Sequence, residues 1–308
     1  MNFDLIVIGG GAGGCFAAIR VAELYPGARI CILESARKPL SKVEVSGGGR
    51  CNVTHACFDP EVLAGYYPRG SKELTGPFHR FQPADMMEWL ERHGVRLKTE
   101  EDGRMFPVTD RSQTIIDCFM NAMRNSRIQL MLSTRATGWQ FDESSKSWYV
   151  TLPDKARLTS KYLMIATGSD QRTWDGLKLA GHSIVSPVPS LFTFNIRVKD
   201  LNAMAGISMP DVITSIPALK LQTSGPLLIT HWGFSGPAIL KLSAWGAREL
   251  YACNYVFDAQ INWCRQSEEQ EVIRSIKQTM TRNTKKQVHN LMLFGMPTRL
   301  WKFICLRA

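Results

Sequence analysis

The start of the chain constrains the fold more than any other part of it. An apolar run over residues 5–8 leads directly into the sequence Gly9-Gly10-Gly11-Ala12-Gly13-Gly14. An uninterrupted apolar run with β-branched residues is typical of a parallel strand buried on both faces, and residues 15–22 have the composition of a helix. We therefore expect the glycines at a strand-to-helix turn, the arrangement that binds a dinucleotide.

Three of these glycines occupy positions with a physical requirement. Gly9 permits the tight turn, Gly11 lacks the Cβ atom that would block a pyrophosphate, and Gly14 lets the helix pack close to the strand. The free N–H groups and the dipole of the helix N-terminus favour phosphates. Ala12 and Gly13 belong to the same turn, so all five residues are predicted to bind the cofactor.

An acidic residue completes this pattern. A second strand is expected over residues 29–33, and Glu34 follows it, 20 residues after Gly14. A carboxylate at the end of this strand can accept hydrogen bonds from both hydroxyls of an adenosine ribose and repels a 2′-phosphate. With strand, turn, helix and carboxylate in register, a dinucleotide site is favoured over an ordinary glycine-rich turn. FAD and NAD are both open at this point.

Two later segments favour FAD. Residues 158–168 form a predicted buried strand that ends in Ala166-Thr167-Gly168, which resembles the second nucleotide motif of glutathione-reductase-type flavoproteins. Before it, residues 139–141 and 148–152 flank a polar stretch and predict a hairpin of the β-meander that those proteins insert there. A plain NAD domain would alternate helices and strands in this region.

The other segment is the loop Ser46-Gly47-Gly48-Gly49-Arg50-Cys51-Asn52-Val53-Thr54. Three consecutive glycines lose much conformational entropy on folding, so they mark backbone that approaches another group closely or adopts positive φ. The glycines alone support a flexible surface loop and a flavin-contacting loop equally. The full sequence closely resembles the SGxGRCNxTN motif of a bacterial family of NAD(P)/FAD-dependent oxidoreductases, which includes aminoacetone-oxidase-like and 3-dehydro-bile-acid-reductase-like proteins.

Further motifs extend the resemblance in order along the chain. Residues 103–110 resemble the family's GRxFP box, 181–184 its AxxxGHxI turn and 230–237 its FTHxGxSGP segment, while 243–250 and 294–301 resemble its inserted region. The resemblance implies an FAD-dependent oxidoreductase that acts on a small organic substrate with NAD(P)H or oxygen as redox partner.

The resemblance also implies the domain organisation. The expected fold class is α/β: a glutathione-reductase-type FAD-binding, Rossmann-like domain with an inserted β-barrel-like domain and a helical module. We assign residues 1–190 to the FAD-binding domain with its meander, 191–262 to the insertion and 263–308 to the helical module, with a proline-rich linker over 186–189.

Individual elements follow from local patterns. In the first domain we expect helices over 84–93 and 112–125 and a third strand over 128–132. In the insertion we expect short strands over 191–198, 212–216, 219–222 and 227–230, and a helical chain from residue 266 onward.

The family continues beyond the point where this chain stops, with a segment that closes over the cofactor. Its absence after Ala308 implies that the chain holds the adenosine half of FAD through residues 9–14 and Glu34, leaves the ring open and binds FAD weakly. A catalytically incomplete flavoprotein fragment is therefore one alternative. The chain also differs from the family pattern at His55 and over residues 169–174.

Two residues of the glycine loop have alternative roles. Arg50 could stabilise negative charge on the reduced flavin or the phosphates, while an ion pair that fixes the loop is equally supported. Cys51 has no cysteine beside it and is favoured as a small packed side chain. No catalytic residue is assigned, and no metal site is predicted because no His, Cys or carboxylate pair has ligand spacing.

The motifs together predict the following cofactor-binding residues: Gly9, Gly11, Ala12, Gly13, Gly14, Glu34, Ser46, Gly47, Gly48, Gly49, Arg50, Cys51, Asn52, Thr54, Ala166, Thr167 and Gly168.

Composition is ordinary for a globular protein, with 44% hydrophobic and 21% charged residues among 308. No apolar run approaches the roughly 20 residues of a membrane span, and the N-terminus is a predicted strand rather than a signal peptide. We therefore expect a cytoplasmic protein without a membrane partner. The eight cysteines form no CxxC pair, so neither a redox disulfide nor a zinc ribbon is indicated.

The net charge of +10 is unevenly distributed, because residues 272–308 contain eight basic residues and no acidic one. Clustered Lys and Arg suit nucleic acid, and a flavoprotein acting on tRNA is a second alternative. However, Val272, Ile276 and Met280 recur at helical spacing, so the solvated face of an amphipathic helix is the favoured interpretation and a nucleic-acid partner is disfavoured. The oligomeric state stays open.

Overall fold

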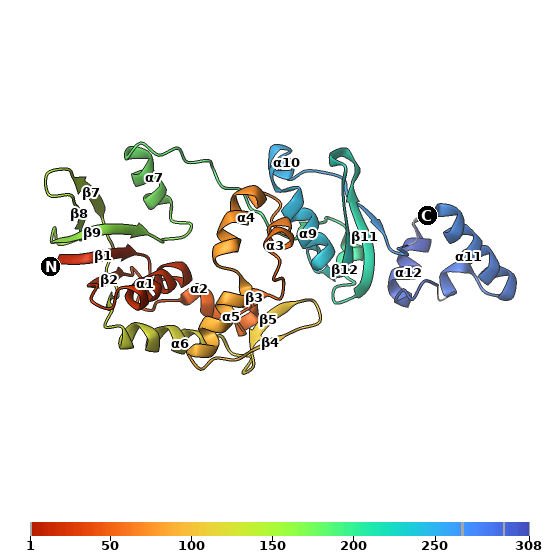
Figure 1. Ribbon diagram of the computed structural model, residues 1–308. Helices are drawn as coiled ribbons and strands as arrows, with labels where there is room; N and C mark the ends of the chain where they lie inside the picture. Colours follow the sequence, from red (N-terminus) through yellow and green to blue (C-terminus); the bar gives the residue numbers. More distant parts are fainter. Residues whose placement is uncertain (1, 266–267, 292, 308) are drawn as a thin grey trace. The chain divides into compact units, whose positions relative to one another are not determined.

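The computed structural model describes residues 2–265, 268–291 and 293–307. The chain divides into two compact units, Met1–Ile184 and Val185–Ala308 (Figure 1). The division falls just before the proline-rich segment 186–189. Assignment of the second unit to an insertion and a separate helical module stays a prediction.

The first unit is built on a six-stranded sheet in the order β6-β2-β1-β9-β8-β7. Its strands are β1 (Asn2–Ile8), β2 (Ile30–Leu33), β6 (Gln129–Met131), β7 (Gly138–Asp142), β8 (Ser147–Thr151) and β9 (Arg157–Ile165). β1 pairs in parallel with β2 and β9, and β2 pairs in parallel with β6. β7 and β8 form an antiparallel hairpin beside β9, as predicted for the meander.

Some helices of the first unit, α1 and α6 among them, cover this sheet because their apolar faces need burial. The helices of the first unit are α1 (Ala12–Leu24), α2 (Ser41–Val45), α3 (Pro60–Gly65), α4 (Ser71–Arg80), α5 (Pro83–Arg92), α6 (Ser112–Asn125), α7 (Gln171–Leu179) and the 3₁₀ turn η1 (Ser46–Gly49). α1 and α6 lie on one face (Figure 1), where Ile19, Trp89 and Phe119 share a buried cluster. Ile6 and Ile8 point to the opposite face and pack with Val150 of β8.

A small sheet in the order β3-β5-β4 was not predicted. It comprises β3 (Thr54–His55), β4 (Leu97–Thr99) and β5 (Arg104–Pro107). Strands of two to four residues are too short to show a hydrophobic period, so only tertiary pairing reveals them.

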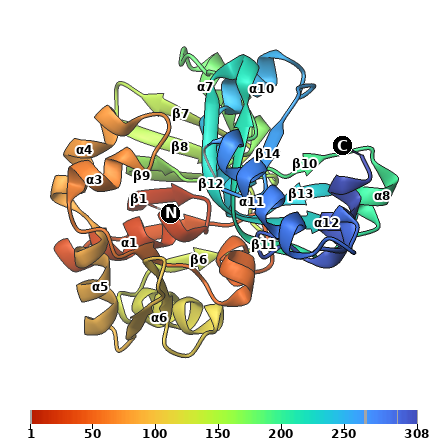
Figure 2. The ribbon, with the colours of Figure 1, turned by 90° about the vertical axis from the view of Figure 1, so that its right-hand side faces the viewer.

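The second unit contains a five-stranded antiparallel sheet in the order β10-β13-β12-β11-β14. Its strands are β10 (Phe194–Asn195), β11 (Ser208–Ile216), β12 (Leu221–Thr230), β13 (Gly233–Ser235) and β14 (Gln260–Asn262). Its helices are α8 (Lys199–Asn202), α9 (Pro237–Trp245), α10 (Ala247–Ala252), α11 (Glu269–Arg282) and α12 (Thr298–Cys305), with 3₁₀ turns η2 (Pro217–Leu219) and η3 (Val288–Asn290). Figure 2 shows β10 beside β13, with which it pairs.

Three predictions for this unit were wrong. Residues 191–198 are not one strand: in the described part of the chain β10 covers residues 194 and 195 alone and pairs with the short β13, and α8 begins at Lys199. The strands predicted over 219–222 and 227–230 are not separate: residues 221–222 and 227–230 belong to one strand, β12, while residue 219 ends η2 and residue 220 caps it. Gly225 and Pro226, which suggest a turn, lie inside β12 opposite an irregularity in β11, where a proline is tolerated.

The third wrong prediction for the second unit concerns its helices. α9 and α10 lie in the region predicted to be β-barrel-like, where short strands and no helix were expected, and α9 is held by the buried side chains of Ile239 and Leu242 against the sheet. The helical chain predicted from residue 266 is interrupted, with α11 and α12 separated by η3. Residues 266 and 267 themselves lie outside the described residues.

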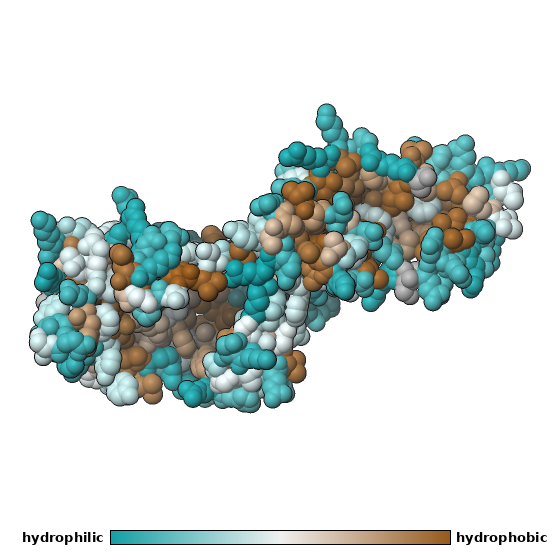
Figure 3. Space-filling model, turned by 90° about the horizontal axis from the view of Figure 1, so that it is seen from above, coloured by the Kyte–Doolittle hydropathy of each residue, from teal (hydrophilic) through white to brown (hydrophobic). Residues whose placement is uncertain are grey.

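Hydrophobic groups are spread over the surface rather than confined to the core, as the brown areas in Figure 3 show. Leu179 and Val256 are examples, with exposed fractions of 90% and 80%. Among the described residues, no helix is long and apolar enough to cross a membrane.

Candidate cofactor site

The glycine-rich segment forms the predicted turn between β1 and α1. Gly9 has a φ of +113°, and a Cβ atom there would lie 2.4 Å from the carbonyl oxygen of Ala166. A Cβ atom on Gly14 would lie 2.1 Å from the carbonyl oxygen of Gly9. Both positions therefore require glycine. Gly9 is needed for the turn and for its close approach to Ala166, the residue after β9, and Gly14 is needed for the close packing of α1 against the turn.

The space in front of the turn is open. A Cβ atom on Gly11 or on Gly13 would meet no described atom within 4 Å. α1 begins at Ala12, and no side chain of the described residues caps its first turn. The free N–H groups of this 13-residue helix therefore face an open space that suits an anion such as a pyrophosphate.

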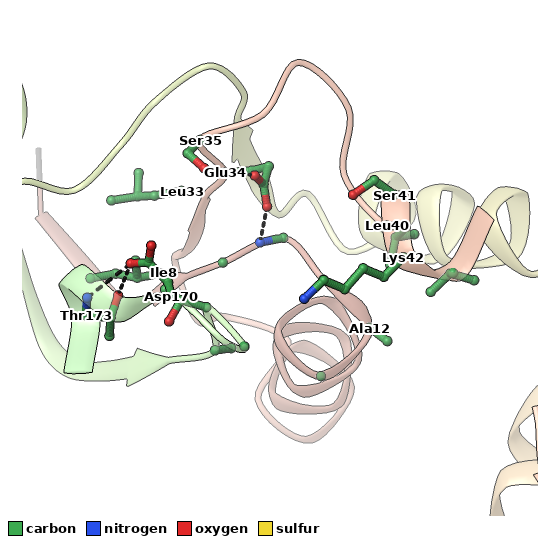
Figure 4. A pocket seen from close by; sticks show the side chains of 18 of the residues that line it. Ile8, Ala12, Leu33, Glu34, Ser35, Leu40, Ser41, Lys42, Asp170 and Thr173 are labelled. Atoms are coloured by element: carbon green, nitrogen blue, oxygen red, sulfur yellow. Dashed lines mark hydrogen bonds between the residues drawn. The ribbon is translucent and has the colours of Figure 1, made fainter. Parts of the chain in front are cut away.

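Glu34 lies over this turn at the end of β2. The N–H of Gly10 donates to its Oε2 and the N–H of Ala36 donates to its Oε1, both at 2.7 Å. Figure 4 shows the carboxylate directed at the backbone of the turn. A carboxylate oxygen can accept more than one hydrogen bond, so each oxygen retains capacity for a ligand hydroxyl.

These groups open onto a cavity of about 990 Å³ in the first unit. Ligand sites reach roughly 1,000 Å³, so the cavity is large enough for an extended cofactor. Its wall includes residues 9–13, 40–43, 51–53, 134–137, 166–168, 170, 172 and 173.

The cavity brings together most of the predicted cofactor residues. Those in its wall are Gly9, Gly11, Ala12, Gly13, Glu34, Ser46, Cys51, Asn52, Ala166, Thr167 and Gly168. Those outside its wall are Gly14, Gly47, Gly48, Gly49, Arg50 and Thr54. Assignment of all of them to the cofactor stays a proposal.

The glycines of the second loop adopt the positive φ that was one of the two expectations. Gly47, Gly48 and Gly49 have φ values of +56°, +68° and +83°. A Cβ atom on Gly47 would also lie 2.7 Å from the backbone nitrogen of Asn52. The loop therefore turns sharply and directs Asn52 and Cys51 to the cavity wall. Burial raises the pKa of the Cys51 thiol, which disfavours a reactive thiolate.

Arg50 points elsewhere. Its Nη1 donates to Glu100 at 2.6 Å and to Asp110 at 3.4 Å, and its guanidinium lies 4.0 Å from the centre of the Phe106 ring. Hydrogen bonding to Glu100 raises the pKa of Arg50 further. This geometry matches the loop-fixing ion pair, the second of the two interpretations of Arg50.

Sequence reasoning missed Lys42. This residue of α2 extends into the cavity toward the glycine turn (Figure 4), and its Nζ lies 3.5 Å from the position of a Cβ atom on Gly168. It forms no ion pair with the described residues. α2 has only five residues, too few for a periodic signal, so the position of Lys42 emerges only from the fold.

Asp170 also lines the cavity but has a structural task. It accepts hydrogen bonds from the backbone N–H and the hydroxyl of Thr173 at 3.1 and 2.7 Å, which caps α7. These bonds lower the pKa of Asp170. No group of three or more His, Cys, Asp or Glu side chains suited to a metal ion occurs in the described part of the chain.

The glycine turn, Glu34 and the surrounding sheet form a Rossmann-like arrangement, and the comparison with known protein families gives the same result. The model of the HI0933-like protein Rossmann domain matches residues 3–288. The chain belongs to this family. The predicted family relationship and the Rossmann-like α/β fold are thereby confirmed.

The relatives that this chain resembles are named for two different enzymatic activities. The ribosomal RNA dihydrouridine synthase of Escherichia coli is 26% identical over 272 residues, which cover 84% of this chain and 65% of that protein. The 3-dehydro-bile acid delta(4,6)-reductase of Clostridium scindens is 23% identical over 255 residues, which cover 80% and 61%. The chain thus spans less than two thirds of the length of either relative.

A further ribosomal RNA dihydrouridine synthase, from Haemophilus influenzae, is 26% identical over 287 residues, or 88% of this chain and 70% of that protein. Among solved structures, THI4 of Thermovibrio ammonificans aligns with a TM-score of 0.43 and 14% identity over 61% of this chain and 68% of that chain.

Proposed function

We propose that the chain binds FAD and takes part in the reduction of a carbon–carbon double bond conjugated with a carbonyl group. The observation that carries the proposal is the Glu34 carboxylate, fixed by two backbone N–H groups above an uncapped helix N-terminus at a cavity of about 990 Å³. This combination suits a dinucleotide with an unphosphorylated adenosine ribose.

The residues fit FAD along the length of the cavity. Glu34 would accept from the ribose hydroxyls, and the first N–H groups of α1 would donate to the pyrophosphate. Lys42 adds a positive charge near the same phosphates. The wall formed by Ser46, Cys51 and Asn52 would lie against the remainder of the cofactor.

The reaction class is supported by what the relatives' names have in common. Forming dihydrouridine saturates a double bond of the uracil ring next to a carbonyl, and a delta(4,6)-reductase of a 3-oxo steroid acts on double bonds conjugated with the ketone. Both reductions add a hydride and a proton. FAD, when bound and reduced, supplies the hydride, and NAD(P)H is the proposed electron donor.

The chain's own residues would bind and orient the cofactor and exclude water. The buried residues Leu40 and Val43 and the half-buried Met86 form apolar parts of the cavity wall, which lowers the local dielectric around a reacting group. No side chain of this wall is assigned as the proton donor.

For the substrate we propose uridine in RNA over a free small molecule. Two relatives carry the name ribosomal RNA dihydrouridine synthase, and eight of the ten net positive charges lie within residues 272–308. The sequence alone disfavoured a nucleic-acid partner, and this proposal now favours one.

The test begins with the cofactor. Ligand released by heat from the purified chain is identified by mass spectrometry, and NADPH or NADH is added anaerobically while the flavin absorbance is followed. The chain is then incubated with ribosomal RNA that lacks dihydrouridine, and the nucleosides are analysed for a gain of two hydrogens.

FAD, bleaching of its absorbance and new dihydrouridine would support the proposal. NADP as the released ligand would overturn the cofactor assignment. Reduction of a steroid dienone with no change in RNA would overturn the substrate while leaving the reaction class intact.

A further inference from the structure

Two of the basic residues near the end of the chain, Arg274 and Lys277, lie on one side of a helix together with polar residues. Gln270, Arg274, Lys277 and Thr281 recur along α11 at intervals of four, three and four residues, so they share a face. With Ile273 and Gln278 they line a shallow hollow of about 410 Å³. We define Gln270, Arg274, Lys277 and Thr281 as the basic face of α11.

α11 is fixed from the opposite side. Ile276 packs against the hydrophobic core of the second unit, while Arg274 and Lys277 are exposed. In Figure 3 the right-hand end of the view, where α11 lies, is mostly teal and white. The helix therefore presents a row of hydrogen-bond donors to solvent: one amide, one guanidinium, one ammonium and one hydroxyl group.

The charges of this face lack internal partners. Arg307 pairs with Asp200, and Arg299 donates to a backbone carbonyl. Arg274, Lys277 and Arg282, in contrast, form no ion pair with any described residue, and the acidic Glu269 and Glu271 lie in the first turn off the basic face. An ordinary solvated helix face carries Glu and Lys at i,i+4, which lowers repulsion. A face of one sign is favoured when it meets an anion.

The chemistry of the face favours RNA over a membrane. Helices that lie on membranes place Trp, Phe or Leu beside their basic residues, and α11 contains none of these three residue types. The lack of aromatic residues also argues against base stacking, so the contacts would be to phosphates and independent of sequence.

We propose that the basic face of α11 docks the phosphate backbone of RNA. Arg282, Lys285 and Lys286, all exposed, continue the positive charge beyond the end of the helix. The inference rests on the proposed function, because it supplies the contact that would hold an RNA substrate.

The test uses the full chain with Arg274→Glu and Lys277→Glu combined. Both positions are exposed and Glu is a good helix former, so the fold should persist, which circular dichroism and the melting temperature check. The matched control combines Lys72→Glu and Arg80→Glu, which reverse two exposed charges on α4 that, like those of the basic face, form no ion pair with the described residues. Binding to purified ribosomal RNA is measured at several salt concentrations.

We expect the dissociation constant of the α11 variant for RNA to rise at least tenfold at low salt. The slope of log Kd against log salt should fall by about 2, since each phosphate contact contributes about 0.9. The control should bind like the unmodified chain, and NADPH-dependent bleaching of flavin should be the same in all three proteins.

An α11 variant that binds RNA with unchanged affinity and salt slope would overturn the docking proposal. Binding to vesicles of anionic lipid is measured in parallel. If the α11 variant loses binding to the vesicles but keeps its binding to RNA, the basic face serves a membrane and the proposal is also overturned. Failure of the proposed function gives a different result. In that case no dihydrouridine forms although the α11 charges still control RNA binding.

Discussion

The β1–α1 turn and the loop over residues 46–54 are both rich in glycine, but only the turn places glycines in the wall of the cavity. In the turn, Gly9 and Gly14 are needed because a Cβ atom would strike neighbouring backbone, and Gly11 faces open space. In the loop, Gly47, Gly48 and Gly49 are needed for positive φ, and none of them lines the cavity. A glycine-rich motif therefore marks either ligand contact or backbone shape, and only the surroundings tell which.

The largest effect should come from Gly14→Val. The new side chain would collide with the carbonyl oxygen of Gly9, which belongs to the rigid turn and cannot move aside. We expect the free energy of unfolding to fall by about 3 kcal/mol, measured by urea denaturation. Stability equal to that of the unmodified chain would show that α1 can shift away from β1.

Gly11→Val is the matched variant at the same turn. Position 11 has extended backbone and open space, so the fold should lose at most about 1 kcal/mol. The valine would occupy the proposed pyrophosphate position, and we expect loss of FAD, measured as flavin per chain. A variant that retains flavin but unfolds readily would assign this glycine to the turn alone.

The third prediction concerns Glu34. Glu34→Gln keeps the shape but loses the charge that strengthens hydrogen bonds to ribose hydroxyls, so FAD affinity should fall about tenfold. Glu34→Arg should release FAD entirely. FAD titration by fluorescence quenching measures both, and unchanged affinity in Glu34→Arg would contradict the assignment of the ribose to this carboxylate.

The contrast between turn and loop also explains what the sequence could predict. The helix over 112–125 was predicted with the bounds that the structure has, because Ile115, Phe119 and Ala122 repeat along one buried face. The strand–turn–helix at the N-terminus was likewise encoded within a few adjacent residues. Both elements are determined by residues close together in the sequence, and such elements can be predicted without knowledge of the tertiary structure.

The direction of Arg50 could not be predicted in this way. Its partners Glu100 and Asp110 lie 50 and 60 residues further along the chain, so they meet Arg50 only when the small sheet has formed. Lys42 enters the cavity for a similar reason, since a short helix places it there. Long-range packing decides these positions.

Lys42→Met should have a moderate effect. Lys42 is exposed at the cavity, where water screens its charge, so its contribution to phosphate binding should be at most about 1 kcal/mol. We expect FAD affinity to fall up to about fivefold in low salt, with less difference in high salt. Lys42→Arg should restore affinity, and an effect of Lys42→Met that is independent of salt would point to packing instead.

The smallest effect on stability should come from Arg50→Gln. The pH dependence of its melting temperature tests whether Arg50 fixes the loop over residues 46–54. Hydrogen bonding to Lys98, together with Arg50, lowers the pKa of Asp110 below its usual 3.8. A lowered pKa in the folded state means that the ion pair contributes stability above about pH 4 and loses it as the pH falls through the folded pKa. We therefore expect a slightly lower melting temperature for Arg50→Gln at pH 7, and a difference that shrinks below pH 4, with flavin per chain unchanged throughout. If flavin is lost while the melting temperature stays the same, Arg50 acts on the cofactor and the ion pair is incidental, and both glycine-rich regions would then serve the ligand.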